Sequence, residues 1–244
     1  MAIRPNANPM ITLNLIQKHL RSIADPTTAL VSQSFFKTAP GQYGAGDIFL
    51  GIKVPTLRAL VKTFRDTAPN IISALLKSKF HEERLFALIL LIDFYQRGDE
   101  ADKQCAYELY LAHTAYINNW DLVDVSASQI VGDFLSTRSR QPLYQLVTSD
   151  ALWERRIAII ATFHFIRRNE FADTLRISEQ LLPDTHDLIH KAVGWMLREV
   201  GKRDMATAEL FLQQHYHNMP RTMLRYAIER FPEVRRKQYL SGLI

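Results

Sequence analysis

The segment RLFALIL, residues 84–90, places the small residue Ala87 among large apolar side chains, and similar segments follow it along the chain. These later segments are DVSASQI (124–130), RRIAIIA (155–161), AVGWML (192–197) and RYAIERF (225–231), with Ala127, Ala158, Gly194 and Ala227 as their small residues. The small residues lie roughly 30 to 40 positions apart, a period typical of stacked repeats with two helices each. A small side chain would let neighbouring helix axes approach closely. Chance recurrence of alanine in helices is the alternative.

The rest of the sequence is also helical in pattern. Apolar residues recur at helical spacing almost throughout, and no clear alternating strand pattern is present. Four of the nine glycines fall in GQYGAGDIFLG, residues 41–51, which predicts one long loop. Elsewhere short proline-containing breaks separate helix-length segments. We therefore predict an all-α fold in a single domain, residues 1–244, with residues 1–10 poorly ordered.

Composition limits the class of protein. The chain has 244 residues, of which 47% are hydrophobic and 23% charged, as in an ordinary globular protein. Its single cysteine, Cys105, excludes an internal disulfide and fits a reducing cytosol; we expect it to be a core thiol and not a nucleophile. The longest apolar run, Leu85 to Phe94, contains Asp93 and is too short to span a bilayer. These features predict a cytoplasmic protein with no membrane partner.

The segment NNWDLVDVSA, residues 118–127, carries the first candidate site. Asp121 would lie in the first turn of a helix, where a carboxylate favours the positive end of the helix dipole. Asp124 lies four residues after Trp120, so both side chains share one helix face. An unpaired buried carboxylate would cost several kcal/mol, so Asp124 must face solvent or meet a cation. The alternative to a functional carboxylate is a structural ion pair with an arginine of the next repeat.

The second candidate site lies in the segment HKAVGWMLREVGK, residues 190–202. Lys191, Trp195, Arg198 and Lys202 fall on one helical stripe, opposite a core-facing side. A large aromatic in a basic stripe suits a nucleic-acid backbone with a base or sugar against the ring. The alternative is a solvated face on which the tryptophan makes a cation–π contact with arginine.

Further cations could add to a nucleic-acid surface. Arg155 and Arg156 lie one repeat after Asp124, so either could be its partner or bind a phosphate. Arg221 and Arg225 lie four residues apart on one face of a later helix. The net charge of +5, with a pI near 9.3, favours polyanionic partners only weakly, so local placement must carry the argument.

Metal chemistry is not expected. The segment HDLIH has His186 and His190 at i, i+4, but no third ligand follows at a recognised spacing. Residues Thr185 to Asp187 are more typical of a helix cap. We expect no metal and no other cofactor.

Together these segments resemble a known family. INNWDLVD (117–124), DALWERRIAI (150–159), HKAVGWMLREVGKRD (190–204) and MPRTMLRYAIERFP (219–232) are similar to segments of the AlkD-type DNA alkylation repair proteins. In the first half, IFLGIKVPTLR (48–58) and HEERLFAL (81–88) match the same family. The resemblance runs in order from about residue 30 to residue 240.

The resemblance implies a right-handed solenoid of HEAT-like helical-pair repeats with a basic concave face. It implies a monofunctional DNA glycosylase that acts on cationic N3- and N7-alkylpurines in duplex DNA and leaves an abasic site, as in base excision repair. The family's catalytic tryptophan and aspartate fall on Trp120 and Asp124, its DNA-contacting arginine on Arg156 and its second tryptophan on Trp195. Asn119 replaces a tryptophan of the best-known member and Val125 a serine; we expect both to tune activity.

The expected partner is therefore double-stranded DNA containing alkylated bases, bound by a monomer that is nucleoid-associated when on DNA. Lys191, Arg198, Lys202, Arg221 and Arg225 are expected to hold phosphates beside Arg155 or Arg156. Two rival functions are a non-catalytic DNA-binding repeat protein and a protein-interaction scaffold, since some relatives lack activity and helical solenoids commonly bind proteins.

Overall fold

A computed structural model describes residues 11–244, and all the regular structure there is helical apart from one isolated bridge between Ile48 and Phe80. The prediction of an all-α fold is confirmed. By contacts, the chain forms two compact units, of which the first ends at Leu122 and the second runs from Val123 to Ile244. The single-domain assignment stays a prediction, and the expected disorder of residues 1–10 concerns residues outside the described range.

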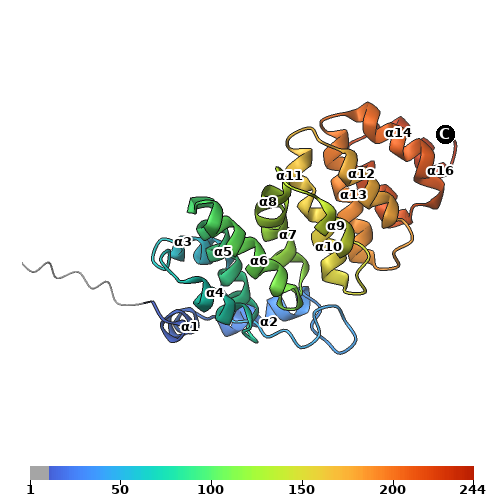
Figure 1. The fold of residues 1–244 in the computed structure, drawn as a ribbon. Helices are drawn as coiled ribbons and strands as arrows, with labels where there is room; N and C mark the ends of the chain where they lie inside the picture. Colours follow the sequence, from blue (N-terminus) through green and yellow to red (C-terminus); the bar gives the residue numbers. More distant parts are fainter. Residues whose placement is uncertain (1–10) are drawn as a thin grey trace, which may run out of the picture. The chain divides into compact units, whose positions relative to one another are not determined.

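The first unit is built from short helices around one long buried helix, α5 (His81–Arg97), which packs against α3, α4 and α6 (Figure 1). The other helices are α1 (Leu13–Ser22), α2 (Pro26–Phe35), α3 (Val54–Leu60), α4 (Pro69–Leu76), α6 (Glu100–Ala112) and the 3₁₀ turn η1 (Thr114–Tyr116). Helix α7 (Trp120–Ala127) begins in this unit, and the boundary between the two units falls within it. The predicted loop at residues 41–51 lies between α2 and α3.

The loop before α3 is held by a buried carboxylate at the start of α5. Glu82 accepts hydrogen bonds from the backbone N–H groups of Leu50, Gly51 and Ile52 at 2.8, 2.7 and 3.2 Å. Gly51 has a φ of +79°, and a Cβ atom there would lie 2.1 Å from the carbonyl oxygen of Asp25. Only glycine fits such a conformation this close to another backbone. The carboxylate and the glycine together explain why this loop has one arrangement.

The next residue of α5 ties it to α1. Glu83 is fully buried and accepts hydrogen bonds from Gln17 at 2.8 Å, Arg21 at 3.0 Å and Ser78 at 2.6 Å. A buried carboxylate is tolerated only when it is paired and hydrogen-bonded, and three donors meet that need here. The HEER segment, residues 81–84, thus uses buried charges to join parts of the unit that lie far apart in sequence.

After α7, the second unit is a succession of helices joined by short turns (Figure 1). Its elements are the π turn η2 (Ser128–Gly132), α8 (Asp133–Leu135), α9 (Gln141–Leu146), α10 (Leu152–Ala161), α11 (Phe163–Ile166), α12 (Ala172–Gln180), α13 (Asp187–Gly201), α14 (Met205–His215), the 3₁₀ turn η3 (Tyr216–Asn218), α15 (Arg221–Ala227) and α16 (Glu233–Ser241). Helix α9 packs against α10, and α12 packs against α13. These are the helical pairs that the sequence period predicts.

Within the second unit the second helices of successive pairs stack on one another, because α10 packs against α13 and α13 against α15. The small residues Ala158, Gly194 and Ala227 lie on these three helices and are buried. Ala87 on α5 and Ala127 on α7 are buried as well. The prediction of helical-pair repeats with small residues at helix contacts is confirmed. The handedness of a whole solenoid and its concave basic face stay predictions.

A second close approach lies at the π turn that continues α7. A Cβ atom on Gly132 would lie 2.3 Å from the carbonyl oxygen of Ala161 and 2.8 Å from the Cβ of His164. The turn from α7 through η2 into α8 is therefore packed directly on the end of α10 and the start of α11. Turns of π type inside α-helices are frequent at functional sites.

One expectation about the fold is wrong. Cys105 is exposed on α6 and is not a core thiol, because the buried side of that helix is formed by Ala106, Tyr107 and Tyr110. From residue 11 to residue 244, none of the helices combines the length and apolar character needed to cross a membrane.

Replacing Gly194 by alanine tests the stacking of α13 on α15. The new Cβ would lie 2.5 Å from the carbonyl oxygen of Met223 and 2.5 Å from the Cβ of Tyr226, so a helix must shift. We expect Gly194→Ala to lower the free energy of unfolding, measured in urea, by about 1–3 kcal/mol, although alanine is the better helix former.

Gly201 is the matched control, since it lies on the same helix and a Cβ there would come no closer than 3.3 Å to the side chain of Ala208. We expect Gly201→Ala to leave the free energy of unfolding unchanged or raise it. Equal stability of the two variants would contradict the close approach at Gly194.

Candidate active site

Trp120 is the first residue of α7 and lies among aromatic side chains of the first unit. Its ring stacks on Phe36, with centroids 5.3 Å apart, and meets the edge of Phe35 at 6.0 Å. Its indole N–H donates to the hydroxyl of Tyr43 over 3.3 Å. The side chain is partly exposed. These contacts hold the indole in one orientation, and the sequence alone does not show that Phe36 and Tyr43 supply them.

The residue after Trp120 is held by a buried histidine. The ring of His81 lies between two carboxylates, with Nδ1 2.9 Å from Asp47 and Nε2 2.8 Å from Asp121. Burial by itself lowers the pKa of His81, but the hydrogen bonds and negative charges of Asp121 and Asp47 more than reverse this and raise it to about 9. His81 is therefore charged at neutral pH and donates to both carboxylates.

Asp47 also meets Arg84 and Asn119. Arg84 donates to its Oδ1 through Nη2, and the Asn119 amide donates to Oδ2 over 3.3 Å. Burial tends to raise the pKa of Asp47, but the hydrogen bond from His81 and the charge of Arg84 hold it below its usual range. Asn119 Oδ1 in turn accepts from the backbone N–H of Trp120 at 2.8 Å. The position that replaces a tryptophan of the family thus has a structural contact at the start of α7.

In the second unit Asp124 meets Arg156. The guanidinium of Arg156 donates from Nε to Oδ1 at 2.9 Å and from Nη2 to Oδ2 at 2.8 Å, a bidentate pair. Its Nη1 donates to the carbonyl oxygen of Leu188 at the start of α13. The Arg156 side chain is 5% exposed, whereas that of Asp124 is 18% exposed. The cation is buried and has a partner at each of its three nitrogens, and the carboxylate still reaches the surface.

This geometry answers which arginine faces Asp124. Arg155 points elsewhere, with Nε 2.7 Å from Asp184 and Nη1 donating to the carbonyl oxygens of Ser149 and Asp150. Both arginines thus make intramolecular bonds that phosphate binding would have to replace. Their DNA contacts stay predictions.

Trp195 has a partner on its own helix. Its indole N–H donates to Glu199 over 3.2 Å, and Lys202 donates to the same carboxylate at 2.6 Å. Glu199 is nearly buried. It lies four residues after Trp195, a spacing by which the sequence could have revealed it. The structure therefore joins the tryptophan and the last lysine of the predicted stripe through one carboxylate.

A further aromatic lies beside Trp195. The Phe163 ring is 5.9 Å from it between centroids, and the Arg167 guanidinium lies 4.3 Å above the Phe163 ring. The Phe163 ring therefore lies between the Arg167 guanidinium and the Trp195 indole and contacts both.

The rest of the predicted stripe is less basic than its sequence suggests. Lys191 lies 2.8 Å from Asp187, and Arg198 is paired with Glu229 of the segment after α15. Arg221 is exposed and donates to the carbonyl oxygen of Leu240, and Arg225 is exposed. The cations of the stripe therefore lie in ion pairs, not on an unopposed basic surface.

The histidines of HDLIH serve the start of α13. His186 is the N-cap residue, and its Nδ1 accepts from the backbone N–H of Leu188 at 3.1 Å. His190 bonds to the carbonyl oxygen of Asp184 at 2.5 Å. The expectation of a helix cap in this segment is confirmed.

His81 should make stability depend on pH. Its pKa is raised from 6.5 to about 9 in the folded chain, so its contribution is fully present below pH 6.5 and is lost as the pH rises through 9. The contribution is on the order of 3 kcal/mol. We expect the difference in free energy of unfolding between wild type and His81→Gln to shrink from pH 6.5 to pH 9.5.

The control is His217→Gln, which removes an exposed histidine. Its difference from wild type should stay constant over the same range, measured by urea unfolding at each pH. A His81→Gln difference that stays constant too would contradict a charged histidine between Asp47 and Asp121.

Comparison with known proteins gives three findings. The solved structure of a predicted DNA alkylation repair enzyme from Enterococcus faecalis is similar in fold, with a TM-score of 0.68 and 18% sequence identity, over 86% of this chain and 97% of that one. No curated protein matches the chain. The model of the family described as DNA alkylation repair enzyme matches residues 16–231. The chain therefore belongs to the DNA alkylation repair enzyme family.

Proposed function

We propose that this member of the family is a monofunctional DNA glycosylase, which hydrolyses the N-glycosidic bond of cationic N3- and N7-alkylpurines in duplex DNA and leaves an abasic site. The observation that supports it most is the state of Asp124. Its carboxylate is oriented by a buried guanidinium and yet remains 18% exposed. A purely structural ion pair would have no need of that exposure, whereas a carboxylate that acts on a sugar requires it.

The chemistry of the substrate defines what the carboxylate does. Alkylation at N3 or N7 makes the purine a cation, so the base is already a good leaving group and needs no general acid. Positive charge then grows on the sugar as the glycosidic bond stretches. Asp124, ionised, stabilises that charge and positions or deprotonates the attacking water. Preorganised electrostatic groups of this kind contribute several kcal/mol in other enzymes, roughly 3–4 for one donor.

Arg156 acts in this proposal as a positioning residue. Its two N–H groups take one lone-pair direction on each oxygen of Asp124, at 2.9 and 2.8 Å. The Asp124 side chain is 18% exposed, so the carboxylate can still face a cationic sugar. The nearby guanidinium weakens the field of the carboxylate but holds it in one rotamer. That arrangement suits a reaction in which the leaving base needs no proton.

The tryptophans are proposed to offer their ring faces to the sugar. The contact between Trp195 and Glu199 uses the indole N–H and leaves the face of the ring uncovered by that bond. Aromatic faces attract positive charge, so such contacts strengthen as the sugar becomes cationic. Trp120, fixed by Phe36 and Tyr43, is proposed to do the same.

Phosphate binding is proposed to involve exchange of ion pairs. Lys191 and Lys202 are 40% exposed at their side chains, and Asp187 is 57% exposed. Exposed ion pairs contribute only about 0–1 kcal/mol, so a DNA phosphate can compete for Lys191. Exchange at Lys202 would take a donor from Glu199, whose side chain is only 9% exposed. Arg225 is exposed on α15, and among the described residues the structure shows no carboxylate paired with it. A phosphate would therefore bind it without replacing an ion pair.

Asp124→Asn tests the catalytic role. We expect release of N7-methylguanine from methylated duplex DNA to fall about 10²–10³-fold, because the neutral amide cannot stabilise a cationic sugar. Affinity for the duplex should change little. Released base is measured by mass spectrometry, and affinity by fluorescence anisotropy of a labelled duplex.

The matched control is Asp184→Asn, which breaks the neighbouring ion pair to Arg155 without touching Asp124. It should keep base release at the wild-type rate. Wild-type release by Asp124→Asn would remove that residue from the chemistry, and absence of release from the wild type itself would favour the non-catalytic DNA-binding function.

Salt dependence tests the DNA partner. We expect affinity for an unmodified duplex to fall steeply between 50 and 200 mM salt, as counterion release requires. Arg225→Gln should lower the slope of log affinity against log salt by about 1 and weaken binding to all sequences alike. Affinity that does not change with salt would favour the protein-interaction scaffold.

A further inference from the structure

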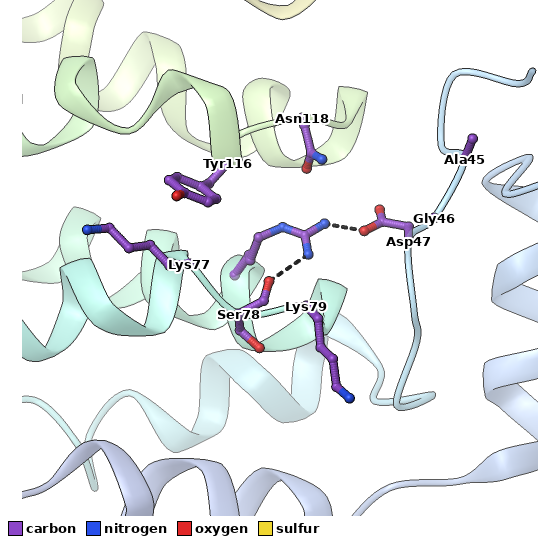
Figure 2. A pocket seen from close by; sticks show the side chains of 9 residues that line it. Ala45, Gly46, Asp47, Lys77, Ser78, Lys79, Tyr116 and Asn118 are labelled. Carbon is purple, nitrogen blue, oxygen red and sulfur yellow. Dashed lines mark hydrogen bonds and ion pairs between the residues drawn. The ribbon is translucent and has the colours of Figure 1, made fainter.

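The first unit contains a pocket that the proposed reaction does not use. It has a volume of about 300 Å³ and lies between the loop before α3, the turn joining α4 to α5, and the segment before α7 (Figure 2). Its lining includes Asp47, Lys77, Lys79, Arg84, Tyr116 and Asn118. We call it the Arg84 pocket. Its volume reaches the lower end of the range for small-ligand sites, about 300–1,000 Å³.

The charge of the Arg84 pocket is positive. Three cationic side chains line it, against the single carboxylate of Asp47. That carboxylate is already neutralised by Arg84 and by the charged ring of His81 behind it. Lys77 and Lys79 are exposed, and neither has a carboxylate partner among the described residues. The pocket therefore carries two lysine charges that nothing in the described chain balances.

The wall of the pocket also has unused hydrogen-bonding groups. Arg84 is 4% exposed; its Nη2 donates to Asp47 and its Nη1 donates to the carbonyl oxygen of Ser78 at 3.0 Å, but its Nε has no partner (Figure 2). The side-chain oxygen of Asn118 is buried without a partner as well. Figure 2 shows the Asn118 amide at the pocket, with the side chains of Lys77 and Lys79 extending in different directions. Unpartnered buried polar groups are rare in folded proteins and usually indicate a missing water or ligand.

We propose that the Arg84 pocket binds a phosphate group. A phosphate oxygen accepts hydrogen bonds and carries negative charge, so it meets the needs of two free ammonium groups, a guanidinium and an amide together. An asparagine amide can present either its oxygen or its NH₂, since the two are nearly indistinguishable in shape. With the NH₂ turned inward, Asn118 adds a donor beside Arg84. A cationic or apolar ligand would leave Lys77 and Lys79 without a counter-charge.

The phosphate has two possible sources, a DNA backbone or a small phosphorylated molecule. Both present the same chemistry to the pocket. The proposal does not depend on base release, because binding of phosphate is measured without an alkylated substrate. Failure of the glycosylase proposal and failure of this one are therefore separate outcomes.

The test is to titrate inorganic phosphate into the full chain at constant ionic strength and to measure binding by isothermal titration calorimetry. The double variant Lys77→Gln/Lys79→Gln should weaken binding at least about tenfold, because two charge-assisted contacts are lost. The control Lys18→Gln/Lys62→Gln removes the same charge from two exposed lysines of the first unit outside the pocket, and should bind as wild type does.

A second variant distinguishes loss of phosphate binding from loss of folding. Asn118→Asp keeps the shape of the side chain but faces Arg84 with a carboxylate, so it should raise or preserve the thermal midpoint while abolishing phosphate binding. If wild type fails to bind phosphate, or if both pocket variants bind it as well as wild type does, the proposal is overturned.

An unmodified duplex then identifies the source. If the pocket holds a DNA phosphate, the duplex competes with inorganic phosphate, and Lys77→Gln/Lys79→Gln weakens duplex affinity more than Lys18→Gln/Lys62→Gln does. If it holds a small phosphorylated molecule, phosphate binding is unaffected by duplex and both double variants bind DNA alike. Either result supports a phosphate site.

Discussion

Buried carboxylates in this fold are possible only because each meets a cation or several N–H groups, and that constraint shapes both units. Glu82 and Glu83 anchor the first unit through backbone and side-chain donors, and His81 lies charged between Asp47 and Asp121. In the second unit Asp124 is held by Arg156. An unpaired carboxylate in such surroundings would cost several kcal/mol, a large share of the stability of a typical domain. Asp124 and Arg156, which the sequence marks as candidate functional residues, are therefore also among the charges that determine the packing.

Such pairing does not exclude catalysis. A carboxylate that must face a cationic sugar has to be ionised and fixed beforehand, and a buried bidentate guanidinium provides both conditions. Arg156 is 5% exposed and Asp124 is 18% exposed, so the cation supports the carboxylate from within. The same logic applies to Trp195, whose N–H is held by Glu199, and to Trp120, whose N–H is held by Tyr43. Each candidate side chain is therefore held by contacts of its own.

The net charge of +5 does not show which cations are available to an anionic partner, because some are ion-paired and others are not. The cations of the stripe on α13 are paired with Asp187, Glu199 and Glu229, whereas the two lysines of the Arg84 pocket have no carboxylate partner in the described chain. Paired surface cations exchange partners at small cost, and unpaired ones attract anions directly. The phosphate contacts proposed on α13 and in the Arg84 pocket therefore rely on two different means.

The pattern of the sequence was enough to predict the helices, the repeat positions such as Gly194, and the candidate residues Asp124 and Trp195. Helical spacing is encoded within a few turns, and the recurrence of small residues can be followed along the chain. It did not decide whether Arg155 or Arg156 faces Asp124, that Glu229 pairs with Arg198, or that Cys105 is exposed. Those depend on the register in which helices some thirty residues apart stack, and a rotation of one residue on a helix changes which side chain faces its neighbour. Only the tertiary structure decides that register, because it is set by packing and buried charge across the whole unit.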